Sequence, residues 1–271
     1  MANTLARRPR YGLRAAAVVY VAILVFVPLL VVTWRTVRQG GGAFWAAISS
    51  AQAVQAFQLT AIVAGAAVIL NVIFGVGVAL LLTRYQFPGK RLFGVLIDVP
   101  ISISPIVVGL ALVLVYGPTN GWFGSWLHGA GINVIFALPG MVLATTFVSL
   151  PLVVREIVPV LQEEGFDQEQ AARVLGASAG QRFLRITLPT IKWALAYGVV
   201  LSLARSIGEF GAVKVVSGNI SGAGQTQTAT LLVDERVEQL EPGAYQVSLV
   251  LIAVAVVAIV VVSLLRPKES S

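Results

Sequence analysis

The sequence contains no cysteine and only one histidine, His128. Without cysteine the chain has no disulfide framework, no thiolate nucleophile and no metal site built on sulfur ligands. A single histidine also excludes a cluster of imidazole ligands. We therefore expect no bound metal or cofactor, and the side-chain chemistry rests on carboxylates, hydroxyls, lysine and arginine.

Charge is scarce as well. Charged residues make up 11% of the 271 residues and apolar residues 57%, with a mean hydropathy of +0.87. A soluble domain carries about 25% charged residues, so most of this chain is expected to lie in lipid rather than water. This composition excludes soluble enzymes and disordered scaffolds. The net charge of +7 then reflects basic cytoplasmic loops rather than nucleic-acid binding.

Six apolar runs are each long enough to cross a bilayer, which requires about 20 residues. A helix satisfies its own backbone hydrogen bonds in hydrocarbon, so the predicted fold class is all-α, a polytopic membrane protein with six transmembrane helices. The first run is too long for a signal-peptide core and has no small-residue cleavage site, so we expect it to remain as a helix. The runs are Ala15–Trp34, Gln58–Leu82, Leu92–Tyr116, Val134–Val154, Trp193–Ser217 and Ala244–Leu265.

Lysine and arginine are distributed unequally between the two sets of connections. Three lie in one set, at Arg35, Arg38 and Arg236. Because cytoplasmic loops carry the basic excess, the richer set is expected to be cytoplasmic, together with both termini. That set holds fourteen: Arg7, Arg8, Arg10, Arg14, Arg84, Lys90, Arg91, Arg155, Arg173, Arg182, Arg185, Lys192, Arg266 and Lys268.

The longest charged stretch, Arg155–Lys192, is predicted to be cytoplasmic and to contain two short helices. Asp167 and Ser178 each stand three residues before a glutamine, the spacing of a capping box. Gly176 stands where the first helix should end, and Leu188-Pro189 should open the fifth span because proline is tolerated in a first helical turn. Taken alone, such a segment is also typical of an amphipathic loop lying on the membrane surface.

The same segment resembles the EAA motif of bacterial ABC importer permeases, which reads E-A-A, three residues, G, nine residues, I-x-L-P. In that family the segment forms coupling helices that sit in a groove of the ATP-binding subunit. This sequence departs from the motif at one position, because Gln170 stands where the family has glutamate and Glu169 precedes it. No salt bridge of the family's glutamate is therefore carried over to this chain. The resemblance implies coupling to the ATPase through Glu169, Gln170, Ala171, Ala172, Gly176, Ile186, Leu188 and Pro189.

The resemblance further implies the type I permease fold and ATP hydrolysis by a separate subunit. The sequence has no G-x-x-x-x-G-K-[ST] loop to hold ATP phosphates, so the chain itself is not expected to be an enzyme. A permease core is expected over residues 57–262, with the coupling loop at about 155–192. Residues 1–56 then hold the N-terminal tail, first helix and first external loop, and residues 263–271 a cytoplasmic tail.

The fifth span contains three charged residues: Arg205, Glu209 and Lys214. In a continuous helix from Trp193, Arg205 would lie roughly 18 Å and Glu209 roughly 24 Å deep, four residues apart and within pairing reach. A charge at such depth costs about 2.5–3.5 kcal/mol. Two interpretations of Arg205 and Glu209 remain open. They form a structural ion pair, or they lie beside the route of a transported anion. Lys214 is expected to extend its side chain to the outer interface.

The run Ala204–Gly218 resembles the fifth-helix signature of the CysW-type permeases of sulfate and thiosulfate importers, A-R-x-x-G-E-F-G-A-x-x-V-V-S-G. Molybdate and tungstate permeases share the central Gly208–Ala212 part, and the continuation favours the sulfate branch. The resemblance implies a cell-membrane (inner or plasma membrane) location in the lipid bilayer. It also implies three partners: a CysT-like second permease, CysA-like ATPase subunits and an extracytoplasmic sulfate-binding protein.

A dianion cannot cross hydrocarbon unaided, so the route is expected to be a polar seam between two permeases. Its candidate lining residues are Ser102, Ser104, Arg205, Gly208, Glu209 and Gly211. A rival hypothesis is a gradient-driven secondary transporter that uses Glu209 and Arg205 as an ion relay. The coupling motif stands against that rival. An intramembrane enzyme is a second rival hypothesis, and it is disfavoured because the chain has no cysteine and no histidine within a predicted span.

Overall fold

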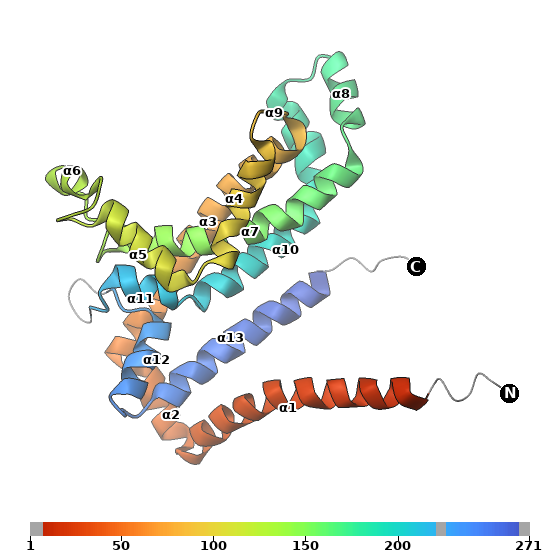
Figure 1. The fold of residues 1–271 in the computed structure, drawn as a ribbon. Coiled ribbons are helices and arrows are strands. Elements are labelled where there is room, and N and C mark those ends of the chain that lie inside the picture. Colours follow the sequence, from red (N-terminus) through yellow and green to blue (C-terminus); the bar gives the residue numbers. More distant parts are fainter. Residues whose placement is uncertain (1–7, 221–225, 266–271) are drawn as a thin grey trace.

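The computed structural model describes residues 8–220 and 226–265, and over these ranges the chain is all-helical, without strands (Figure 1). Arg7, Arg266 and Lys268, which the basic-residue distribution places in the cytoplasm, lie outside the described residues, as does most of the predicted C-terminal tail. The elements are α1 (Arg8–Arg38), α2 (Gly40–Ser49), α3 (Ala51–Arg84), α4 (Lys90–Ser102), α5 (Pro105–Tyr116), α6 (Gly124–Gly129), α7 (Leu138–Glu164), α8 (Asp167–Val174), α9 (Ala179–Arg182), the π-helix η1 (Phe183–Thr187), α10 (Leu188–Ile207), α11 (Gly211–Ser217), α12 (Ala229–Glu238) and α13 (Ala244–Leu265).

Five helical segments in the described part of the chain are long and apolar enough to cross a membrane, and a sixth candidate is a bent pair of helices. The polytopic helical prediction is therefore confirmed. The five are Arg14–Arg38, Ala51–Arg84, Leu138–Glu164, Ala179–Ile207 and Ala244–Val261.

The third predicted span is not one continuous helix, which corrects the sequence interpretation. It divides into α4 and α5, which are bent by 112°. The break falls at Ile103 and Ser104, directly before Pro105. Proline disfavours helical geometry in the residue that precedes it, and Ser104 is extended with ψ 132°.

The fourth and fifth predicted spans had wrong boundaries. α7 begins at Leu138, with Pro139 in its first turn, and continues past Arg155 to Glu164, so the first part of the predicted coupling loop is helix. Gly165, with φ +71°, ends it. The predicted fifth span is interrupted after Ile207, and the separate short helix α11 follows.

The core lies where α3 and α10 pack on α7. Glycines let both helices approach α7 at one residue, Val153. A Cβ added at Gly75 would lie 2.8 Å from Val153 Cγ1, and one at Gly198 would lie 3.1 Å from Val153 Cα. Small residues at such crossings are typical of membrane helices, which associate through close packing.

The functional segments lie at opposite ends of this bundle. α8 and α9 lie at one end of α7 and α10, while α2, α11 and α12 lie at the other end (Figure 1). α1 runs apart from the core and contacts α2 and α13. Its exposed side chains are mostly apolar, as suits a helix surrounded by lipid.

Candidate coupling surface and translocation site

The predicted coupling segment folds as two short helices with a break between them. α8 ends at Val174, and Gly176 has φ +86°, a conformation that favours glycine. At α9 the capping box of Ser178 and Gln181 is present in both directions, which confirms that prediction. The proposed cap at Asp167 was wrong, because Asp167 is the first residue of α8 and Phe166 precedes it without a side-chain cap bond.

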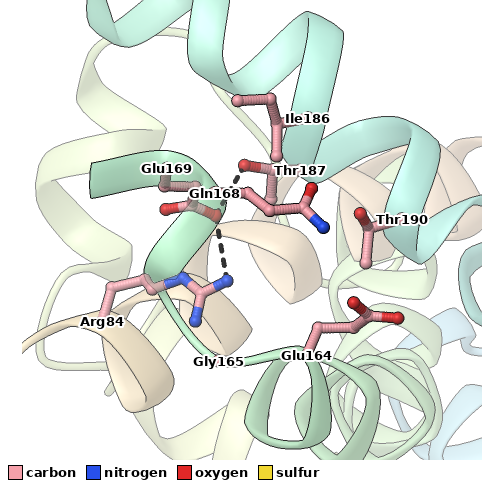
Figure 2. A pocket seen from close by; sticks show the side chains of 8 residues that line it. All are labelled: Arg84, Glu164, Gly165, Gln168, Glu169, Ile186, Thr187 and Thr190. Carbon is pink, nitrogen blue, oxygen red and sulfur yellow. Dashed lines mark hydrogen bonds and ion pairs between the residues drawn. The ribbon is translucent and has the colours of Figure 1, made fainter. Parts of the chain in front are cut away.

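Glu169 holds α8 against the membrane helices. Its Oε1 accepts from Arg84 Nη2 at 2.9 Å and from the Thr187 hydroxyl at 2.9 Å. Figure 2 shows the carboxylate of Glu169 between these two partners. Arg84 also donates to the carbonyl of Leu161 at 3.1 Å, and its guanidinium lies over the ring of Phe166. The helices α3, α7 and α8 and the π-helix η1 therefore meet at one ion pair.

The other predicted coupling residues divide between a surface and this inner contact. Ile186 lines the pocket of Figure 2 beside Thr190. The surface residues include Gln170, so the glutamine at the usual glutamate position faces outward while its neighbour Glu169 takes the internal ion pair. The exposed residues are Gln170, Ala171, Gly176 and Pro189, and the partly buried residues are Glu169, Ala172, Ile186 and Leu188.

Two exposed apolar residues at the tip of α8 were not predicted to contribute. Val174 is 87% and Leu175 86% exposed, directly before the glycine break. An apolar pair at the end of an otherwise polar helix was the available signal in the sequence. Large apolar side chains that are fully exposed beyond the bundle are typical of a surface that docks another protein.

Changing Gly176 to tryptophan is expected to block docking of the ATPase without preventing membrane insertion. A Cβ at this position meets no atom within 4 Å, so the indole would project outward from the coupling segment. The measurement is co-purification of the ATPase with the permease. Gly176→Ala is the matched control, because it introduces the same strain at φ +86° without the bulk. Normal co-purification with the tryptophan variant would contradict the coupling assignment.

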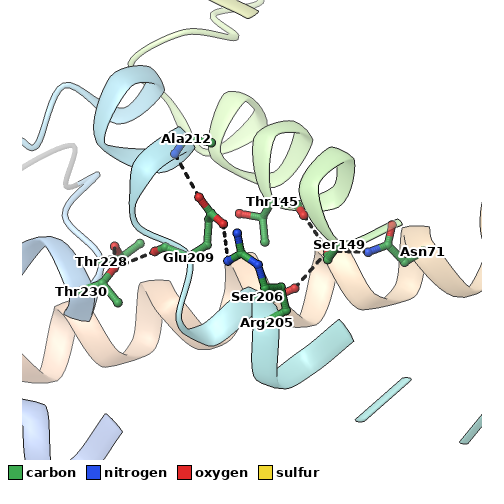
Figure 3. Close-up of polar contacts among 9 residues, drawn as sticks. All are labelled: Asn71, Thr145, Ser149, Arg205, Ser206, Glu209, Ala212, Thr228 and Thr230. Atoms are coloured by element: carbon green, nitrogen blue, oxygen red, sulfur yellow. Dashed lines mark hydrogen bonds and ion pairs between the residues drawn. The ribbon is translucent and has the colours of Figure 1, made fainter. Parts of the chain in front are cut away.

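An ion pair with a buried carboxylate occupies the break between α10 and α11. Arg205 Nη1 lies 2.5 Å from Glu209 Oε2, and the side chains are 37% and 2% exposed. The other carboxylate oxygen of Glu209 accepts from the amide of Ala212 at 3.0 Å (Figure 3). The predicted pairing is confirmed, but Glu209 follows the end of α10 instead of lying within a continuous helix. Its carboxylate satisfies a donor in the first turn of α11.

A polar network that the sequence analysis missed lies beside this pair. Asn71 donates to the hydroxyls of Ser149 at 2.7 Å and Ser202 at 3.1 Å, and Ser206 donates to Ser149 at 3.3 Å. All four residues are buried, and together they join α3, α7 and α10. Figure 3 shows three of them, Asn71, Ser149 and Ser206. Ser202 and Ser206 are four residues apart, which was the available signal in the sequence. Asn71 Oδ1 and Thr145 Oγ1 remain buried without a hydrogen-bond partner.

The two helix breaks contact each other. A Cβ at Gly211 would lie 3.1 Å from Pro105 Cβ, and one at Gly109 would lie 2.8 Å from the carbonyl oxygen of Ala212. The structure thus brings together the start of α5, next to Ser104, and the start of α11, next to Glu209. Ser102 and Ser104 are exposed at their break. Irregular backbone at membrane depth is tolerated where it is buried in protein or lines a water-filled cavity.

Lys214 does not merely extend toward the outer interface as predicted. It lies in α11 and forms ion pairs with two residues of α12, Asp234 at 2.6 Å and Glu238 at 3.4 Å. These carboxylates follow it by twenty residues or more, so the local pattern did not indicate them. The contacts hold α12 against α11 at the end of the bundle opposite the coupling segment.

Comparison with known proteins gives a consistent result. Residues 71–270 match the family model "Binding-protein-dependent transport system inner membrane component". The chain is 44% identical over 260 residues to a sulfate transport system permease protein CysW of Synechocystis sp., covering 96% of this chain and 93% of that protein. It is 34% identical over 253 residues to a CysT permease protein of Escherichia coli, covering 93% and 90%.

A solved structure shares the fold at low sequence identity. The bacterial alginate ABC transporter in complex with an alginate pentasaccharide-bound periplasmic protein superposes with a TM-score of 0.74 at 18% identity. The alignment covers 94% of this chain and 91% of that one. Helical content, the spanning segments, the family match and the relatives all agree. The chain therefore belongs to the family of inner membrane components of binding-protein-dependent transport systems.

Proposed function

We propose that this chain is the CysW-type permease subunit of an ABC importer for sulfate and thiosulfate. The observation that carries this proposal is the 44% identity to a CysW protein over 96% of the chain. The lower identity of 34% to a CysT protein favours the CysW role. A CysT-like chain is then the second permease of the pair.

ATP hydrolysis is assigned to CysA-like partner subunits. The sequence contains no phosphate-binding loop of the G-x-x-x-x-G-K-[ST] type. The outward-facing part of the coupling segment, with Gln170 and the exposed Val174 and Leu175, supplies a docking surface at the end of the bundle. The basic residues favour a cytoplasmic location for this end and for both termini.

The transport mechanism is alternating access. Closure of the ATPase dimer draws the coupling segments of the two permeases together, and the ion pair of Arg84 with Glu169 passes this movement to α3 and α7. The permease pair then opens outward to receive the anion from an extracytoplasmic sulfate-binding protein. Hydrolysis resets the pair. The periplasmic protein in the solved alginate transporter complex supports such a delivery step by analogy of fold.

The candidate route for the anion passes the contact between the two helix breaks. Arg205 is the cation there, and its partly exposed guanidinium retains N–H donors beyond the one used on Glu209. Glu209 positions Arg205, and its carboxylate offsets part of the positive charge at the site. A dianion is therefore attracted without being held permanently. Ser102, Ser104, Gly208 and Gly211 complete the proposed lining.

Two other functions make different predictions. A molybdate or tungstate importer would keep the fold and the coupling to ATP but change the anion. A gradient-driven anion transporter would not need ATP. The decisive experiment is uptake of radiolabelled sulfate in a strain lacking this chain, with and without the restored gene.

The assay includes competition by unlabelled thiosulfate, molybdate and tungstate, and one arm in which ATP is depleted while the proton gradient is kept. We expect uptake that requires the chain, requires ATP and is inhibited by thiosulfate. Uptake that survives ATP depletion would favour the gradient-driven transporter. Loss of molybdate uptake with unchanged sulfate uptake would overturn the anion assignment.

A further inference from the structure

A second ion pair joins two candidate spanning segments, on the exposed side of the contact between α4 and α7. Asp98 Oδ1 and Arg155 Nε are 2.9 Å apart, with side chains 46% and 53% exposed. The basic-residue distribution placed Arg155 in a cytoplasmic loop. The structure instead places Arg155 in α7 and Asp98 in α4, two helices that pack against each other.

The pair lies some way inside the bundle. Arg155 is nine residues before the end of α7, and Asp98 is eight residues after the start of α4. At about 1.5 Å per residue these positions are roughly 12–14 Å from the ends of their helices. Charges that face lipid at depth cost about 2.5–3.5 kcal/mol each. This face of the seam therefore needs water or a polar partner.

A groove of ≈ 590 Å³ lies about one helical turn from the ion pair, nearer the helix ends, and neither Asp98 nor Arg155 lines it. Arg91 and Gly94 line it from α4, and they share a stripe with Asp98 at the spacing of helical turns. Val158 and Gln162 line it from α7 and share a stripe with Arg155 in the same way. Lys90 and Arg91 are the charged lining residues and both are basic.

The apolar side chains of α4 lie on a different stripe. Leu92, Val95 and Leu96 are 64%, 63% and 54% exposed, as expected of a surface that meets lipid or protein. One face of α4 is thus apolar, and another borders a groove of mixed lining whose charged residues are basic. The two ion pairs differ in exposure. Glu209 of the first pair is 2% exposed, whereas both members of the Asp98–Arg155 pair are accessible.

We propose that this groove, together with the ion pair one helical turn away, is a release site for the transported tetrahedral oxyanion on its way to the cytoplasm. Arg155 receives the anion, Asp98 competes for the guanidinium and so keeps binding weak, and Lys90 and Arg91 draw the anion to the mouth. A conducting site must bind well enough to be entered and weakly enough to be left. The proposal rests on the proposed function, since it requires an anionic substrate.

The absence of cysteine allows a direct test in the assembled transporter. Val158→Cys places one thiol in the groove, and Leu96→Cys is the matched control on the apolar stripe of α4. Each complex is placed in vesicles with its cytoplasmic side accessible and treated with a negatively charged, membrane-impermeant thiosulfonate. Labelling of this subunit is measured after separation of the subunits, at increasing sulfate concentrations. We expect Val158→Cys to react and sulfate to protect it, whereas Leu96→Cys stays unlabelled.

Charge variants in the Val158→Cys background separate an anion site from a structural ion pair. Asp98→Asn should lower the sulfate concentration for half-protection by about tenfold, because it removes a competing charge next to Arg155. Arg155→Gln should raise that concentration by about tenfold or abolish protection. A purely structural pair predicts changes in the same direction for both variants, and that result would overturn the proposal.

The remaining outcomes are also decisive. No labelling of Val158→Cys, or labelling that sulfate does not reduce, would overturn the release site. Protection of Val158→Cys from labelling could also depend on anionic lipid. If protection is found only in vesicles that contain anionic lipid and is absent in phosphatidylcholine vesicles, the basic groove is assigned to lipid headgroups instead. Sulfate uptake by the Val158→Cys complex is measured in parallel, so transport without protection refutes the groove alone. If the complex transports molybdate and not sulfate, the proposed substrate fails, and protection by molybdate then decides the groove.

Discussion

Replacing Arg205 with leucine is expected to reduce sulfate uptake to background and to destabilise the folded chain by about 3 kcal/mol. The reason is that Glu209 is 2% exposed and would keep a buried carboxylate without its cation. The figure is at the lower end for a broken buried pair because Arg205 itself is partly exposed. Thermal unfolding of the purified complex and radiolabelled uptake measure the two effects.

Two variants make this result interpretable. Glu209→Gln should reduce stability less, because the charge left behind is on the partly exposed Arg205, yet uptake should still fall if the pair lines the route. Lys214→Gln is the control from the same region, and its exposed ion pairs are worth about 1 kcal/mol or less. Full stability and full uptake in Arg205→Leu would show that this pair is neither structural nor on the route.

Reversing the charge of Arg84 is expected to uncouple the permease. In Arg84→Glu two carboxylates would face each other where Arg84 and Glu169 now lie 2.9 Å apart, and α8 would lose its contact with α3 and α7. We expect uptake to fall at least tenfold, since losing a partly buried pair costs more than about 1.4 kcal/mol. The measurements are ATP-dependent uptake and the amount of permease in the membrane.

The double variant Arg84→Glu with Glu169→Arg restores the opposite charges and should recover part of the uptake. Arg84→Lys keeps the charge but lacks the planar group that donates both to Glu169 and to the carbonyl of Leu161, so an intermediate uptake is expected. If the charge exchange gives no recovery while the subunits still assemble, the ion pair does not transmit movement from α8.

Local signals in the sequence correctly predicted the break between α8 and α9 and the start of α9. The glycine with positive φ at Gly176 and the capping box at Ser178 are both decided by neighbours within a few residues, and both are present. The break before Pro105 was also marked locally, but the apolar run around it hid the proline signal. For the fifth span, the four-residue spacing of Arg205 and Glu209 fitted a continuous helix as well as a broken one.

Contacts between distant residues were out of reach of such reasoning. Arg84 and Glu169 are 85 residues apart, and Asn71 and Ser202 are 131 residues apart. Glu169 was selected because of its place beside a motif, whereas its partner was counted only as a basic loop residue. Asn71 looked like one polar residue in an apolar run, and its meaning depends on how α3, α7 and α10 pack.

The positions of the helix ends also bear on how many times the chain crosses the membrane. The end of α3 and the end of α7 lie together, since Arg84 bonds to Leu161, so the chain must pass from one face to the other between Arg84 and the start of α7 at Leu138. This arrangement favours the bent pair α4 and α5 as one span rather than a re-entrant loop, despite its 112° angle. At the opposite face Gln246 donates to Gln39 at 2.6 Å, joining the end of α1 to the start of α13. Six spans would be an even number, and we propose that the start of α1 and the end of α13 emerge on the same side as α8.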